Sequence, residues 1–483
     1  MEDHELPIID IADAPEYIRP LGFFPHEIIN SIVTDLRTAI YVPNERQTKS
    51  NIHNRATIFA DIFTTKLRMI GTNRLFLWNG ACFTQDCESR LMNLIETVHK
   101  DLEIDYSVSK GEEIMTILLN RSDIHDADGR ILNNYPDFIP FQNLYYTISD
   151  HSTSACDYRK YFTYAFNVQF NPTATCPQFL RFLEQIIPNP TYRRKMVLFL
   201  AYCMTSSLKL QKAVVCYGEG SNGKSTLFDL LKELWGSLYT NVAMQEINEK
   251  YMMIEFRGKL LNIGPDLPET RIEEEGKIKE AITENSLSSD EKYHDRTKFH
   301  NTTKHIYGCN EIPLPPLKAG MAFFRRWILI PFTQTFKSPN DPDFDPAIHK
   351  PKDIDLLGKL VSEREGIMAY LISLLPFINE LDITDWRLTR AEWYCHSEST
   401  IQYYMECEQG NGVQCEGNEM YEDYKLWCSH KSVKVTSRKH FENILAQQGY
   451  SKERISTNFG EFQWVYKGIG KPNPNAPNNP FER

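Results

Sequence analysis

The chain has 483 residues, of which 41% are hydrophobic and 12% aromatic, a length that predicts two to four domains rather than one core. The formal net charge of -11 does not indicate a nucleic-acid-binding protein, so any such binding has to come from a local basic patch. The eleven cysteines include no CxxC pair and predict free thiols in a reducing compartment. Neither a signal peptide nor a membrane span is evident, so we expect a soluble, cytoplasmic protein without a membrane partner.

The residues before the middle of the chain predict three segments. Residues 1–50 are acidic and contain several prolines, which is typical of a lead-in or linker. Residues 51–150 predict a small α+β domain, with a helix, a hairpin around 75–83 and a second helix. Residues 151–208 predict a helical domain, because apolar side chains recur on one face of each of two helix-like runs.

A phosphate-binding loop follows the apolar, strand-like run 213–217 and precedes the helix-like run 227–231. Its residues are Gly218, Glu219, Gly220, Ser221, Asn222, Gly223, Lys224, Ser225 and Thr226. The glycines let backbone N–H groups turn inward around phosphates, and the helix directs its positive end at them. Lys224 would reach the β- and γ-phosphates of ATP, and Ser225 would hold Mg²⁺. The sequence therefore predicts an NTPase with an α/β fold, built on a parallel sheet.

Two further apolar runs end in polar residues that suit this chemistry. The run 259–263 leads to Asp266, which we place at the end of a strand next to the phosphate loop, where a carboxylate would hold Mg²⁺ and the attacking water. A capping aspartate in an ordinary loop is the alternative. The run 304–309 ends in Asn310, whose amide could sense the γ-phosphate or simply begin a turn before Pro313.

Two adjacent arginines, Arg325 and Arg326, precede the apolar run 327–332. Placing two cations beside a buried strand costs desolvation free energy, unless one of them binds an anion. In a ring, an arginine from one subunit can neutralise the γ-phosphate bound by its neighbour. We favour Arg326 for this role, with Arg325 as the rival, and a salt bridge to a surface acid as the alternative.

Taken in order, GEGSNGKST, KLLNIGPD, CNEIP and FFRRWILIPF resemble the motifs of the superfamily 3 helicases. More narrowly, they resemble the helicase part of the poxvirus-type and satellite-phage-type primase-helicases, and residues 56–208 resemble the region before the motor in that family. The resemblance implies an AAA+-like P-loop ATPase domain at 209–340. It also implies a DNA helicase that forms a homo-hexamer and moves 3′ to 5′ on single-stranded DNA, in the host cell cytoplasm or at a viral replication site.

Helicases of this type place a DNA-contacting hairpin between the second and third motifs. The residues available here for phosphate contacts or base stacking are Lys292, Tyr293, His294, Arg296 and Lys298. Glu291 and Asp295 dilute their charge, so a solvated polar loop is the alternative.

The C-terminal part predicts a helical extension at 341–406, a winged helix at 407–470 and a disordered tail at 471–483. The winged helix is indicated by two helices followed by an aromatic hairpin. Arg438 and Lys439, followed by His440, begin the second helix, where a recognition helix would meet DNA. A protein contact is the alternative.

Two departures from the family pattern matter. Leu267 and Pro268 follow Asp266 where many relatives have a second acid, so the general base stays open, with Glu269 a weak candidate. No primase domain precedes residue 50, so we predict no primer synthesis by this chain alone and a separate primase or polymerase as a possible partner. The rival functions are an ATP-binding replication initiator or adaptor without unwinding, and a P-loop kinase of small molecules.

Overall fold

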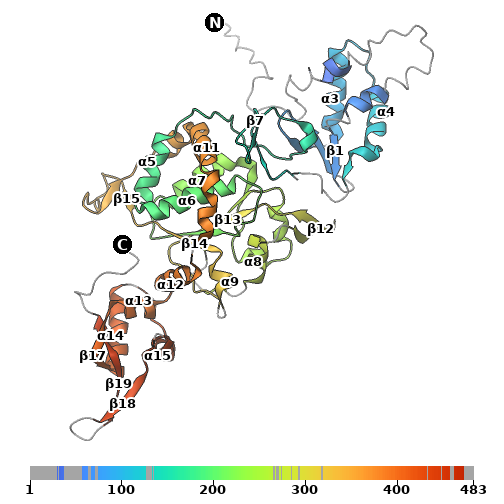
Figure 1. The fold of residues 1–483 in the computed structure, drawn as a ribbon. Helices are drawn as coiled ribbons and strands as arrows, with labels where there is room; N and C mark the ends of the chain where they lie inside the picture. The colour runs from blue at the N-terminus through green and yellow to red at the C-terminus, as the bar shows by residue number, and fades with distance from the viewer. Residues whose placement is uncertain are drawn as a thin grey trace, which may run out of the picture.

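Figure 1 shows the computed structural model of the chain, in which three units follow one another. The structure describes residues 30, 32–36, 57–63, 67–70, 74–86, 88–126, 133, 135–264, 267, 271–272, 275–283, 286–291, 294–316, 319–383, 385–431, 433, 435–447, 449–456 and 462–472. The predictions for Asp266, Glu269, Lys292, Tyr293 and the tail from residue 473 onward lie outside the described residues.

The central unit is built on a five-stranded parallel sheet. Its strands are β8 (Ala213–Tyr217), β9 (Tyr239–Thr240), β10 (Leu261–Gly264), β13 (Lys304–Cys309) and β14 (Trp327–Pro331). They lie in the order β14-β8-β13-β10-β9, which confirms the predicted α/β fold with a parallel sheet. β10 is not adjacent to β8, because β13 pairs with both and separates them.

Helices cover both faces of this sheet (Figure 1). One face packs against α5 (Pro177–Ile186), α6 (Pro190–Cys203), α7 (Lys224–Trp235), α10 (Leu356–Ser362) and α11 (Arg364–Ser373). The other face packs against α8 (Gly276–Thr283), α9 (Met321–Phe324) and α12 (Trp386–Ser397). Because successive strand residues point to opposite faces, Val214 and Cys216 enter the first core while Ala213 and Val215 enter the second. This burial on both sides explains why the strands are continuous apolar runs.

The N-terminal unit has a core of its own. Its sheet has the order β3-β2-β1-β4. The elements are β1 (Leu67–Ile70), β2 (Arg74–Trp78), β3 (Phe83–Asp86), α3 (Glu88–Asp101), α4 (Val108–Leu119) and β4 (His125–Asp126). A small sheet of β5 (Phe138–Pro140), β6 (Tyr145–Thr147) and β7 (Thr153–Ser154) follows. Tyr145 and Tyr146 of this sheet share the core of the central unit. Phe166, in the segment that follows, lies 5.8 Å from Trp235 of α7, measured between ring centroids.

The C-terminal unit also has a separate core. Its elements are α13 (Ser399–Glu406), β17 (Cys407–Glu416), α14 (Gly417–His430), α15 (Arg438–Gln447), β18 (Lys452–Ser456) and β19 (Phe462–Pro472). The predicted pair of helices followed by a hairpin is thus present, and β17 adds a third strand in the order β17-β19-β18. Since β19 runs to Pro472, Lys471 belongs to a strand and not to the predicted tail.

The remaining strands form two short pairs. They are β11 (Ser286–Glu291) with β12 (His294–His300), and β15 (Thr335–Lys337) with β16 (His349–Pro351). Among the helices of the described residues, none is by itself long and apolar enough to cross a membrane. Neither Arg364–Ser373 nor Leu375–Ile383 alone has the length and composition of a membrane-spanning helix. The two segments reach them only when they are taken together, and they are bent by 62° at their junction.

Candidate nucleotide-binding site

The phosphate loop connects the buried strand β8 to helix α7, and its shape requires glycine at two positions. Gly218 has φ +143°, and a Cβ there would run into the carbonyl oxygen of Phe332. Gly223 has φ +89°, and a Cβ there would lie 2.5 Å from the Ile186 side chain. Both conformations are unfavourable for residues with a side chain. The loop therefore forms only because glycine occupies these two positions.

Neighbouring segments hold the loop in place. The Gly218 N–H donates to the Cys309 carbonyl at the end of β13 (3.3 Å), and the Phe336 N–H donates to the Ser221 carbonyl (2.7 Å). Inside the loop, the buried Asn222 side chain donates to the Glu219 carbonyl and accepts from the Lys224 N–H (3.3 Å). These bonds shape the loop before any ligand arrives.

The start of α7 suits a phosphate group. Gly223 is the N-cap and has no side chain to cap the helix; since the Lys224 N–H donates to Asn222, an anion would use the following N–H groups, of Ser225 and Thr226. Lys224 is 8% exposed and donates through Nζ to the Gly218 carbonyl across the loop. Ser225 is exposed on the first turn, where its hydroxyl could serve as a ligand for Mg²⁺. The residues present therefore fit a nucleotide phosphate, with Mg²⁺ beside Ser225.

Asn310 lies on the same edge of the sheet as the loop. It follows Cys309, whose carbonyl accepts the Gly218 N–H, and it is exposed. Asp266 is outside the described residues, but Leu267 after it donates to the Gly308 carbonyl at the end of β13 (2.8 Å). Because all five strands are parallel, their carboxyl ends meet at this edge.

The two arginines lie at the opposite edge. The Arg326 carbonyl accepts the N–H of Ala213, the first residue of β8, and β14 begins immediately after Arg326. The five residues of β8 separate this edge from the phosphate loop by roughly 16 Å, at about 3.3 Å per residue. Arg325 and Arg326 are therefore a full strand length away from the phosphate loop of their own chain.

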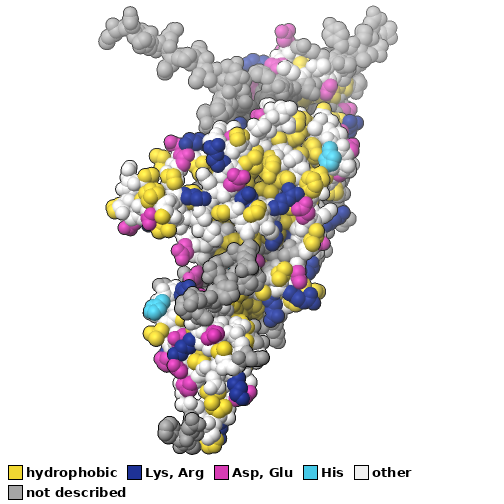
Figure 2. All heavy atoms as spheres, turned by 60° about the vertical axis from the view of Figure 1, so that its left-hand side comes forward, with side chains coloured by type: hydrophobic (Ala, Val, Ile, Leu, Met, Phe, Trp, Pro, Cys, Tyr) yellow, Lys and Arg dark blue, Asp and Glu magenta, His cyan; other side chains and the backbone are white. Residues whose placement is uncertain are grey.

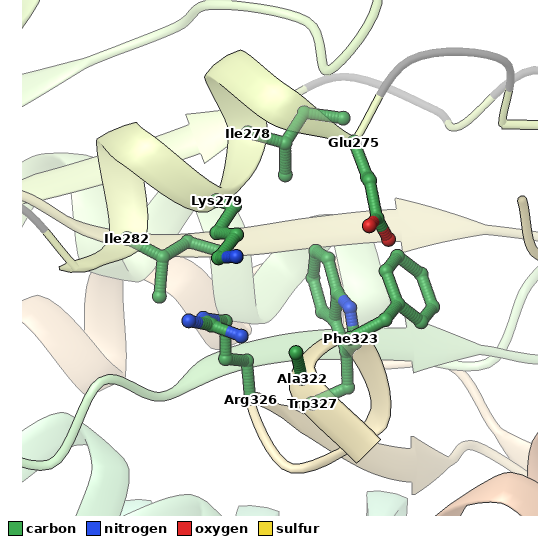
Figure 3. Close-up of a pocket in the computed structure, with 8 residues that line it drawn as sticks. All are labelled: Glu275, Ile278, Lys279, Ile282, Ala322, Phe323, Arg326 and Trp327. Atoms are coloured by element: carbon green, nitrogen blue, oxygen red, sulfur yellow. The ribbon is translucent and has the colours of Figure 1, made fainter. Parts of the chain in front are cut away.

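Arg326 is buried in a small pocket between α8 and α9, with an exposed fraction of 5% (Figure 3). Within the described part of the chain, its Nε and Nη1 atoms have no hydrogen-bond partner, and neither does Oε2 of Glu275 in the same pocket. Burial, followed by the nearby Arg325, lowers the pKa of Arg326 to about 10, while Glu275 acts in the opposite direction. Figure 3 also shows Lys279 on the side of the pocket where Arg326 lies. Burying guanidinium N–H groups without hydrogen bonds costs free energy, so a new hydrogen-bond partner would stabilise Arg326.

Arg325 is partly exposed and already has a partner. Its Nη2 donates to Oε1 of Gln211 (2.5 Å), just before β8. Its carbonyl accepts from Nζ of the buried Lys212 (2.7 Å). Neither Gln211 nor Glu275 could be found from the sequence, because both lie far along the chain from the arginines and outside any motif.

The predicted DNA-contacting residues lie in two places. His294, Arg296 and Lys298 belong to β12, which forms an antiparallel hairpin with β11, so a hairpin is present between β10 and β13. On α15, Arg438 Nε is 2.9 Å from Glu442, and His440 Nε2 is 3.0 Å from the buried Glu398. Lys439 is exposed. Arg438 and Glu442 lie four residues apart on one helix, whereas Glu398, the partner of His440, lies on another element and could not be found from the sequence.

The comparisons with known proteins support the resemblance drawn from the motifs. Residues 56–188 match the family model described as D5 N terminal like, and residues 216–326 match a family of unknown function, DUF5906. The first match lies before the phosphate loop and the second contains it, and together they confirm the resemblance to the poxvirus-type primase-helicases. Residues 56–188 are thus similar to the N-terminal region of that family, and a parallel sheet with a phosphate loop follows them.

One curated relative is a protein of Acanthamoeba polyphaga mimivirus named "Putative helicase L207/L206". It is 23% identical over 248 residues, which make up 47% of this chain and 24% of the relative, so the match spans about a quarter of the relative's length. Two apo structures of the NrS-1 C-terminal region cover 84% and 85% of this chain and 96% and 98% of theirs. Both are 11% identical to it, with TM-scores of 0.43 and 0.44.

Proposed function

We propose that this chain is an ATP-driven DNA helicase of a viral or plasmid replication system. The uncapped start of α7, the glycine-dependent loop and Lys224 supply the nucleotide site. The D5-type N-terminal region and the relative named as a helicase support the coupling of that site to DNA.

The proposal depends mainly on one observation: strand β8 separates the phosphate loop from the two arginines by its full length. A γ-phosphate at Lys224 is out of reach of Arg326 in the same chain, so an arginine that neutralises it has to come from a neighbour. A head-to-tail ring repeats this contact at every interface. We propose a hexamer that moves 3′ to 5′ on single-stranded DNA and works with a separate primase or polymerase.

Within this proposal each predicted residue has a role. Lys224 and the loop amides hold the phosphates, Ser225 and Asp266 hold Mg²⁺, and Asn310 senses the γ-phosphate. Arg326 leaves its pocket to reach the neighbour's nucleotide, with Arg325 as the rival. Hydrolysis removes the charge that holds the interface, and the β11–β12 hairpin then shifts along the DNA strand.

A mixing experiment tests the shared site. Lys224→Ala and Arg326→Ala are each expected to lose ATP hydrolysis, because the first lacks the phosphate ligand and the second the neighbour's cation. In a random equimolar mixture, about a quarter of interfaces combine an intact loop with an intact arginine, so about a quarter of the wild-type rate should return. Arg325→Ala, treated in the same way, decides between the two arginines.

The outcomes separate the rival functions. A mixture that stays inactive, or a monomer that hydrolyses ATP at full rate, contradicts a site shared between subunits. Hydrolysis that single-stranded DNA stimulates supports a motor, whereas slow turnover without stimulation supports a switch. Phosphate transfer to an added acceptor supports a kinase.

A further inference from the structure

The C-terminal unit carries exposed aromatic side chains on the hairpin of β18 and β19. Phe462 and Trp464 are 60% and 54% exposed, although such large rings are usually mostly buried. Alternate residues share one face of a strand, and Tyr466, on the same face of β19, is buried in the unit's core. Figure 1 shows the hairpin running out beyond α14 and α15. The face of β19 that is covered at Tyr466 is therefore exposed at Trp464 and Phe462.

The residues opposite these rings on β18 are cationic or neutral. Arg454 lies opposite Trp464, and Ser456 lies opposite Phe462. The guanidinium carbon of Arg454 is 4.0 Å from the centroid of the Phe462 ring. The ion pairs of the described hairpin residues are Lys452–Glu442, Lys467–Glu453 and Lys471–Glu419, and none of them includes Arg454. We call Arg454, Ser456, Phe462 and Trp464 the hairpin strip; it contains no acid.

On the side of the hairpin that carries the strip, two described cations share one acid, whereas several glutamates line the other side. Arg438 and Lys452 share one carboxylate, that of Glu442, at 2.9 and 2.5 Å. Two cations facing a single acid leave a surplus of positive charge beside Arg454. Elsewhere, on the face shown in Figure 2, basic and acidic side chains are interspersed. For a chain whose net charge is -11, this is the kind of local patch that binding to a polyanion requires.

We propose that the hairpin strip binds single-stranded nucleic acid, with bases stacked on Trp464 and Phe462 and a phosphate beside Arg454. Exposed rings on an open strand surface, next to a guanidinium that forms no ion pair with any described residue, are the chemistry that holds unstacked bases. The bases of a duplex stack on each other and cannot reach such rings. A protein partner could also use Trp and Arg, but the described residues of the strip include no acid and lie beside two cations that share Glu442, which favours a polyanion. This inference rests on the proposed function and assigns nucleic-acid binding to the hairpin instead of α15.

Cross-linking of the unmodified full chain tests the contact directly. The probe is an oligothymidylate that contains 5-iodouracil, whose photoreaction favours aromatic side chains, and the linked peptides are identified by mass spectrometry. A cross-link at Phe462 or Trp464 is expected. Cross-links restricted to other segments, such as 286–300 or α15, would overturn the proposal.

Affinity measurements with substituted full chains give the second test. Trp464→Ala and Phe462→Ala are each expected to weaken binding of a fluorescein-labelled oligothymidylate roughly 5- to 100-fold, as stacking on one aromatic residue predicts. Leu426→Ala, at a 61% exposed position on α14 of the same unit, is the matched control and should bind as wild type. Unchanged affinity in both aromatic variants overturns the proposal, as does a defect for duplex DNA alone.

ATP hydrolysis without DNA, measured on the same preparations, separates this proposal from the proposed function. All three variants should hydrolyse ATP at the wild-type rate, because the hairpin strip belongs to a core separate from the nucleotide site. A wild-type chain without hydrolysis contradicts the proposed function. A hydrolysing chain whose strip variants bind oligothymidylate normally contradicts only the hairpin strip.

Discussion

At the scale of single residues, the phosphate loop contains glycines with different structural roles. Gly223 has φ +89° and touches the Ile186 side chain, whereas a Cβ at Gly220 would have no atom within 4 Å and Gly220 has no positive φ. Both the backbone conformation and the close packing therefore require glycine at position 223, and neither requires it at position 220.

We predict that Gly223→Ala raises the dissociation constant for ATP by more than about tenfold, because it distorts the amides that face the phosphates. Gly220→Ala is the matched control and should stay within about twofold of wild type. Titration with a fluorescent ATP analogue measures both. Equal damage from the two substitutions would show that the loop does not depend on this backbone geometry.

Lys304 is a buried cation at the beginning of β13, with an exposed fraction of 1%. Its Nζ donates to the Thr302 carbonyl at 2.9 Å and to the Thr205 carbonyl. Burial lowers its pKa to about 7, with the nearby Cys203 acting in the opposite direction. The neutral amine has two N–H groups, one for each carbonyl, so the uncharged form suits this site.

A pH dependence of stability follows. Unfolded lysine keeps its proton up to a pH of about 10.4, whereas folded Lys304 releases it near pH 7, so the unfolded state binds more protons in between. The free energy of unfolding should rise with pH across this window, by at most about 1.4 kcal/mol per pH unit from this group. Lys304→Met should remove that part of the slope. Urea unfolding at pH 7 and pH 9 measures it, and equal slopes in both proteins contradict the prediction.

At the scale of secondary structure elements, α12 connects three parts of the candidate site. The Trp393 ring lies 5.3 and 5.6 Å from the rings of Phe323 and Trp327, on either side of the arginine pair, and its Nε1 donates to the Pro313 carbonyl (2.8 Å). The His396 ring lies 4.7 Å from Tyr217, just before the phosphate loop. Part of the predicted helical extension at 341–406 is therefore buried and packs against both ends of the candidate site.

We expect Trp393→Ala to lower the free energy of unfolding by about 3–5 kcal/mol, since it leaves a large cavity and an unpaired carbonyl. Trp464→Ala, which removes the same side chain from an exposed position, should change it by no more than about 0.5 kcal/mol. Urea titrations followed by circular dichroism compare the two. Similar losses in both variants would contradict the role of α12.

At the scale of the whole molecule, α13 packs with the C-terminal unit. Tyr403 lies in its core, and the hydroxyls of Ser399 and Tyr424 are 2.7 Å apart. Trp393 of the preceding helix α12 lies instead in a core of the central unit. The two cores therefore separate between α12 and α13.

Two truncations test this boundary. A chain that ends at residue 397 should stay soluble and retain ATP hydrolysis without DNA, because both cores of the sheet remain complete. A chain that ends at residue 406 keeps α13 but uncovers Tyr403, and it should aggregate more readily. Light scattering during gentle heating compares them, and equal solubility would place the boundary elsewhere.

The sequence by itself determined the features whose causes are local. A buried strand, a glycine-bearing loop and a helix follow one another within about 25 residues, so their spacing alone predicts the phosphate site. Continuous apolar runs likewise predict strands that are buried on both faces. The predicted strand 304–309 agrees with β13 at both ends, and the strand predicted at 259–263 begins two residues later, at Leu261.

Only the tertiary structure decided the features that depend on distant residues. β13 is inserted between β8 and β10, and the arginine pair lies at the edge of the sheet opposite the phosphate loop. The burial of Arg326 beside α8, the pairing of His440 with Glu398 and the open face of the β18–β19 hairpin also arise from tertiary packing. Packing between segments far apart in the chain creates these contacts, and residue types or spacings do not encode it locally.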